Sequence, residues 1–79
     1  RSKQAIEASG KRLKQVEARI AAIQSEAKHI EDELADPGLY GSDGGGALVR
    51  LTQKQAELGR ERETLETEWL ALYEQQESA

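Results

Sequence analysis

The chain has 79 residues, a formal net charge of −4, a charged fraction of 33% and no cysteine. This length allows one small domain, the lack of cysteine excludes disulfides and thiolate metal sites, and no apolar run approaches the roughly 20 residues of a membrane-spanning helix. The sequence starts at Arg1 without a methionine and has no recognisable signal peptide, so we expect it to be a piece of a larger protein.

The first helix is predicted over about residues 12–35, after a polar segment, residues 1–11, that we expect to be frayed. Gly10 disfavours helix in that segment by about 1 kcal/mol relative to alanine. From there, apolar residues recur at alternating intervals of three and four, which is a heptad pattern with one narrow apolar stripe. The stripe consists of Leu13, Val16, Ile20, Ile23, Ala27, Ile30 and Leu34.

A loop is predicted over residues 36–46. Proline disfavours helical geometry at the residue before it and has no N–H to donate, so Asp36-Pro37 ends the first helix. We expect Leu39 and Tyr40, the apolar residues of this polar loop, to fold back and cover the end of the helices.

The second helix is predicted over about residues 47–75, followed by a tail, residues 76–79. Ser42 or Asp43 is the expected N-cap, since short polar side chains accept hydrogen bonds from the first helical N–H groups. The second heptad stripe consists of Leu48, Leu51, Leu58, Leu65, Trp69 and Leu72, with polar residues at Gln55 and Arg62.

A narrow stripe needs a partner helix, and a single loop between two such helices makes the chain its own partner. The predicted fold class is therefore all-α, a two-helix antiparallel coiled-coil hairpin. Facing residue numbers should add up to 81 or 82, which places Leu13 opposite Trp69. Packing in this core is the expected role of Trp69, and stacking on a nucleic-acid base is the alternative.

Charge is unevenly distributed along the chain. Residues 1–20 carry six Lys or Arg against two Glu, whereas residues 21–79 carry five against thirteen Asp or Glu. The basic end would lie beside acidic residues of the second helix, so its charges can be neutralised internally or can bind a partner. The candidate contact residues are Lys3, Lys11, Arg12, Lys14 and Arg19.

The sequence offers no recognisable catalytic, cofactor or metal site. Its glycine-rich run, residues 41–46, does not have the pattern of a phosphate-binding loop. His29 is the only histidine, and a metal site needs several ligands. We therefore expect a fragment that is not itself an enzyme, in which Pro37, Leu39, Tyr40 and Trp69 have structural roles.

The run Leu34-Ala35-Asp36-Pro37-Gly38-Leu39-Tyr40 between two heptad helices, followed by a late Glu68-Trp69-Leu70, resembles the C-terminal coiled-coil domain of ABC-F ATPases, including Uup-like and YheS-like proteins. The resemblance covers about residues 13–75. It implies two ATP-binding cassettes upstream, with ATP and Mg²⁺ bound there, in a cytoplasmic protein that acts at the ribosome during translation. In Uup-like members it also implies DNA binding by this domain.

The expected function is thus that of an accessory domain that contacts nucleic acid, with DNA and rRNA both open as targets. The alternatives are a structural module that docks on its own ATP-binding cassettes or on another protein, and a homodimerising coiled coil. The acidic balance of residues 21–79 favours docking on protein, because it repels phosphate.

Overall fold

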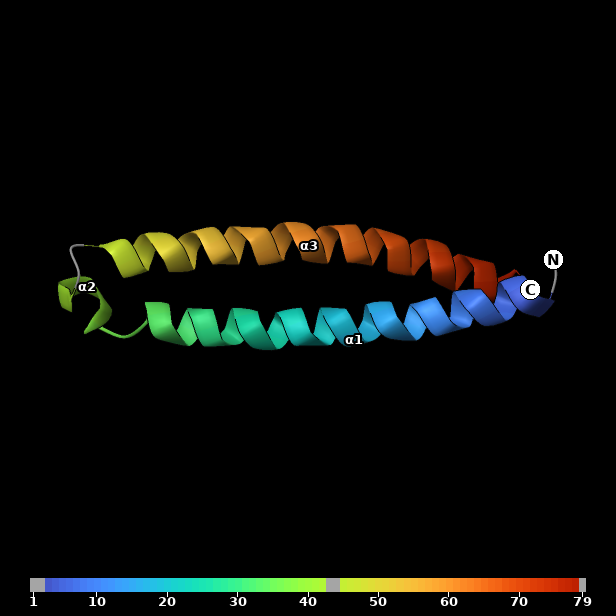
Figure 1. The fold of residues 1–79 in the computed structure, drawn as a ribbon, viewed down its shortest axis with the longest axis horizontal. Helices are drawn as coiled ribbons and strands as arrows, with labels where there is room; N and C mark the ends of the chain where they lie inside the picture. Colours follow the sequence, from blue (N-terminus) through green and yellow to red (C-terminus); the bar gives the residue numbers. More distant parts are fainter. Residues whose placement is uncertain (1–2, 43–44, 79) are drawn as a thin grey trace.

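The computed structural model describes residues 3–42 and 45–78. It contains two long helices, α1 (Lys3–Leu34) and α3 (Gly46–Glu77), and one short helix, α2 (Leu39–Ser42). α1 and α3 lie side by side in opposite directions, with α2 at the turn that joins them (Figure 1). The molecule measures 58 × 15 × 15 Å. The predicted all-α hairpin is confirmed.

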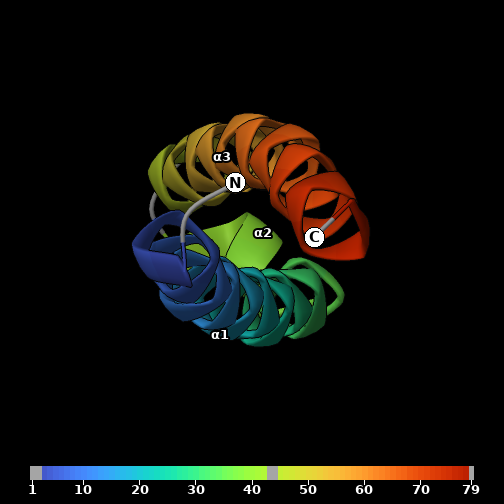
Figure 2. The same ribbon diagram turned by 90° about the vertical axis from the view of Figure 1, so that its right-hand side faces the viewer.

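Five buried residues form the core between α1 and α3. They recur every seven positions on each helix, as a coiled-coil seam requires. Seen along its length, the hairpin has helices that cross instead of lying parallel, which keeps the two stripes facing each other (Figure 2). The buried residues are Val16, Ile23, Ile30, Leu58 and Leu65, and Ile20, Leu34, Leu51, Trp69 and Leu72 pack against them while partly exposed.

α1 begins at Lys3, whereas the sequence predicts a frayed segment up to residue 11 and a firm helix from about residue 12. The end of α3 holds these early turns in place. Gln76 donates a hydrogen bond from Nε2 to the carbonyl of Ile6 at 2.9 Å, and the Ser9 hydroxyl donates to Gln75 Oε1 at 2.7 Å. These tertiary contacts offset the poor helix propensity around Gly10.

The end of α1 and the turn after it are closed by local hydrogen bonds. The Asp36 side chain accepts a hydrogen bond from the Gly38 N–H at 3.0 Å, which is an Asx turn. The Tyr40 hydroxyl donates to the carbonyl of Leu34 at 2.6 Å, so it satisfies one of the helix-terminal acceptors. Tyr40 thus anchors the turn through its hydroxyl, although the residue is 57% exposed.

α3 starts differently from the prediction. Its N-cap is Gly45, with a left-handed φ of 94° and no side-chain capping bond. The Gly45 carbonyl accepts the first helical hydrogen bond, from the Val49 N–H at 3.0 Å. Ser42, one of the two predicted caps, belongs to α2 instead, and Asp43, the other, lies outside the described residues. Glycine suits this cap because it adopts positive φ without steric cost.

α3 ends at Glu77, two residues beyond the end predicted at about residue 75. Ser78 caps it by donating its backbone N–H to the Glu74 carbonyl at 2.9 Å. Among the described residues, no helix is both long enough and apolar enough to span a membrane.

Candidate functional site

One side of the seam is bridged by two arginine–carboxylate pairs, which we call the ion-pair flank (Arg12, Arg19, Glu26, Glu61 and Glu68). Arg12 binds Glu68 through Nε and Nη2 at 2.6 and 2.8 Å, and Arg19 binds Glu61 with the same two distances. Arg19 Nη1 also lies 3.6 Å from Glu26 Oε1. Two of the five predicted contact residues, Arg12 and Arg19, are therefore engaged within the hairpin.

These contacts fix the charge state of the ion-pair flank. The hydrogen bonds from Arg19 and Arg12 lower the pKa of Glu61 and Glu68, respectively, below the ordinary value of 4.5. The same bonds raise the pKa of both arginines. All four side chains are partly solvent-exposed, so water and salt screen their attraction. The pairs favour the antiparallel register and leave little free charge on this side of the seam.

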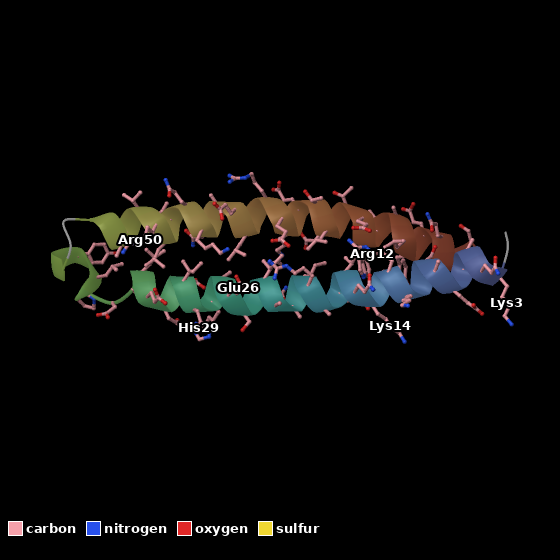
Figure 3. All side chains as sticks on the ribbon, viewed as in Figure 1. Lys3, Arg12, Lys14, Glu26, His29 and Arg50 are labelled. Atoms are coloured by element: carbon pink, nitrogen blue, oxygen red, sulfur yellow. The ribbon has the colours of Figure 1, made fainter. Side chains whose placement is uncertain are left out.

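The three predicted contact lysines occupy a different surface. Lys3, Lys11 and Lys14 are exposed, and within the described residues none of them has an ion pair. Lys3 and Lys14 project from the outer side of α1, away from α3, whereas Arg12 points toward α3 (Figure 3). We call this surface the lysine face (Lys3, Lys11 and Lys14).

A groove of about 470 Å³ lies beside the lysine face near the open end of the hairpin. Lys11 and Lys14 line it, and Glu7 is its one acidic lining residue. At Gly10, the Gln76 amide oxygen lies 3.7 Å from the position that a Cβ would take, which is an ordinary van der Waals distance. The remaining lining residues are Ile6, Gly10 and Gln76.

The other side of the seam carries aromatic rings, and we call it the aromatic flank (Glu17, Glu66, Trp69 and Tyr73). The Trp69 indole N–H donates to Glu17 Oε2 at 3.0 Å, and its ring stacks on that of Tyr73 with 5.1 Å between centroids. Trp69 packs against the core but keeps part of its surface in water. Glu17 and Tyr73 are partners of Trp69 that the sequence did not suggest.

Three further polar residues considered in the sequence are His29, Gln55 and Arg62. His29 is exposed on the outer side of α1 (Figure 3). In residues 3–42 and 45–78, no group of three or more His, Cys, Asp or Glu side chains is arranged to hold a metal ion. Gln55 is exposed, and Arg62 lies at the edge of the seam with its Nε 3.4 Å from Glu66 Oε2.

The sequence placed the basic end beside acidic residues of the second helix, Glu68 among them, but did not indicate which arginine pairs with which carboxylate. The predicted register, in which facing residue numbers add up to 81 or 82, placed residue 69 or 70 opposite Arg12. The arginine instead binds Glu68, and these two residue numbers add up to 80. Arg19 and Glu61 also add up to 80. A search for arginine and glutamate repeating at seven-residue intervals beside the stripe would have found Arg12, Arg19, Glu61 and Glu68, since these are the positions that flank a coiled-coil core.

The fold and these surfaces define a helical-hairpin domain, an extended rod that carries a lysine face, an ion-pair flank and an aromatic flank. The family model of the ABC transporter C-terminal domain matches residues 8–74, so the chain belongs to this family. It is an accessory C-terminal domain of an ABC-type protein and not a catalytic ATPase cassette. This match agrees with the family resemblance that the two heptad segments and the turn between them indicated in the sequence. No curated protein and no solved structure matched the chain.

Proposed function

We propose that this hairpin is the accessory domain of a cytoplasmic, translation-related ABC-F ATPase and that its lysine face contacts nucleic acid. ATP and Mg²⁺ would be bound by cassettes elsewhere in that protein. The supporting observation is the division of the basic cluster: Arg12 and Arg19 are engaged with carboxylates across the seam, whereas Lys3, Lys11 and Lys14 remain exposed. Ammonium groups free to approach phosphate are the usual source of nucleic-acid affinity.

The overall acidity of the chain does not oppose this contact as strongly as the net charge of −4 implies. Exposed charges are screened over about 8 Å at physiological ionic strength. The acidic residues from Glu26 to Asp36 lie about 18 Å or more along the rod from Lys14, which is about two screening lengths. The potential that a phosphate meets is set mainly by the three lysines together with Glu7, Glu17 and the acidic end of α3, where Glu61 and Glu68 are already paired with arginines.

The test is fluorescence anisotropy of the chain with labelled duplex DNA and with a folded RNA hairpin, at low and at physiological salt. The variant Lys3→Gln/Lys11→Gln/Lys14→Gln should weaken binding and reduce the salt slope, by about 0.9 for each lost contact with duplex phosphate. The stronger of the two nucleic acids then identifies the target class.

A control variant with the same net charge uses the cations Lys28, Lys54 and Arg60, changed together to Gln. It should bind nearly as well as the parent chain. Glu7→Gln should bind more tightly, because it removes the one carboxylate that lines the groove beside the lysine face. Equal weakening by the lysine-face variant and the control, or no binding at low salt, would contradict the proposal and favour docking on the protein's own ATP-binding cassettes, testable by binding in trans.

A further inference from the structure

A second groove, of about 320 Å³, lies on the aromatic flank between α1 and α3. Its floor is apolar, formed by Ile20, Ala21 and Trp69, and two carboxylates, Glu17 and Glu66, stand at its edges with Gln24. This volume is at the lower end of the range for ligand pockets. It suits one long side chain better than a cofactor.

The indole that lines this groove is held in one orientation. Its N–H is fixed by Glu17, one ring face stacks on Tyr73 with an interplanar angle of 16°, and the residue also packs against the core. A ligand that contacts Trp69 therefore meets a surface that is already ordered. Such preorganisation lowers the entropic cost of binding.

The charges around the groove are incompletely matched. On the ion-pair flank, Glu61 and Glu68 each receive a bidentate arginine from the opposite helix. On the aromatic flank, Glu66 has only Arg62 of its own helix at 3.4 Å, and among the described residues Glu17 has no ion pair across the seam. The groove thus combines an exposed aromatic surface with negative charge that the hairpin leaves unbalanced.

We propose that this groove docks an arginine-bearing segment of a partner protein, with the guanidinium against Trp69 and hydrogen-bonded to Glu17 and Glu66. A guanidinium is planar, stacks on aromatic rings and forms directed bonds to carboxylates, so it fits both features of the groove. The two carboxylates disfavour a nucleic acid here, because they repel the phosphates that accompany a stacked base. This site is separate from the lysine face and does not depend on it.

The experiment uses the indole N–H resonance of Trp69, which is unambiguous because the chain has one tryptophan. The chain is titrated with an end-capped tri-arginine peptide, and tri-lysine, tri-glutamate and oligothymidine serve as comparison ligands. We expect a saturable shift of the Trp69 resonance with tri-arginine, weaker binding of tri-lysine, and no shift with the two anionic ligands.

Glu17→Gln/Glu66→Gln should weaken tri-arginine binding about fivefold, since each exposed charge pair contributes modestly. Glutamine at position 17 still accepts the indole hydrogen bond, so the fold should persist, as circular dichroism will check. The matched control, Glu33→Gln/Glu57→Gln, removes two exposed carboxylates outside the groove and should change affinity less than twofold. An unmoved Trp69 resonance, equal weakening by the control, or tighter binding of oligothymidine would overturn the proposal.

Discussion

The two sides of the seam between α1 and α3 are held together by different interactions. The ion-pair flank is closed by Arg12–Glu68 and Arg19–Glu61, which pair opposite charges across the helices. The aromatic flank is bridged by one indole hydrogen bond to Glu17 and leaves a groove beside it. A flank whose charges are paired across the helices stabilises the hairpin and has few unpaired groups for a partner to bind. A flank whose carboxylates have no ion pair across the helices can bind one.

The largest effect on stability should come from a substitution in the buried core, which lies between the two flanks. Leu58 is 2% exposed at the centre of the core, so Leu58→Ala should lower the free energy of unfolding by about 3 kcal/mol through lost burial and a cavity. Urea unfolding followed by circular dichroism measures this. Val49→Ala, at a residue 55% exposed, is the control and should be nearly neutral; equal losses would mean that the seam is not the stabilising core.

Removing the aromatic flank should have the next largest effect. Trp69→Ala deletes a partly buried ring together with its stacking on Tyr73 and its bond to Glu17, and we expect a loss of about 2 kcal/mol. The same unfolding measurement applies, with Leu70→Ala, at a 52% exposed neighbour, as the control. If Trp69→Ala were as mild as Leu70→Ala, the indole would be a surface residue with no structural part in the flank.

Breaking the ion-pair flank should have a smaller effect, because its side chains are exposed to solvent. Arg19→Glu and Glu61→Arg should each lower the melting temperature through repulsion across the seam. The double variant, which exchanges the two charges, should recover most of the loss. Failure of the exchange to recover stability would indicate that the pair does not form in solution, and high salt should reduce all these differences.

The smallest effect should be a change in how the melting temperature depends on pH. It is also the effect that distinguishes the two flanks most directly. The pKa of Glu61 and Glu68 is lowered by the hydrogen bonds from Arg19 and Arg12, so their stabilisation is present above pH 4.5 and is lost as the pH falls through the lowered values. Glu61→Gln/Glu68→Gln should therefore show a flatter acid limb in a plot of melting temperature against pH.

The stability contributed by the aromatic flank should change at alkaline pH instead. A hydrogen bond to Glu77 raises the pKa of Tyr73 above its ordinary 10.0, so this contribution is complete below pH 10.0 and is lost as the pH rises through the raised value. Tyr73→Phe should flatten the alkaline limb and leave the acid limb unchanged. Identical pH profiles for the variants of both flanks would remove the distinction between them.

Much of the architecture could be read from the sequence, because heptad spacing is local and repeats many times. The stripe through Val16, Ile23 and Ile30 predicted the buried face of α1, and Asp36-Pro37 predicted its end. The family resemblance rested on the same features. The start of α1 was predicted too late, although Ile6 continues the apolar stripe, because the contacts of Ser9 and Ile6 with Gln75 and Gln76 form only after the hairpin closes.

The sequence by itself determined that two helices pair antiparallel about one turn, since each narrow apolar stripe must be covered and only one loop joins them. Tertiary structure alone decided which cations are neutralised. Whether Arg12 meets Glu68 or the indole of Trp69 depends on how the helices cross and which side of each stripe faces the other. That geometry arises from packing along the whole seam, so it divides the basic cluster into paired arginines and exposed lysines in a way that charge counting along the chain cannot.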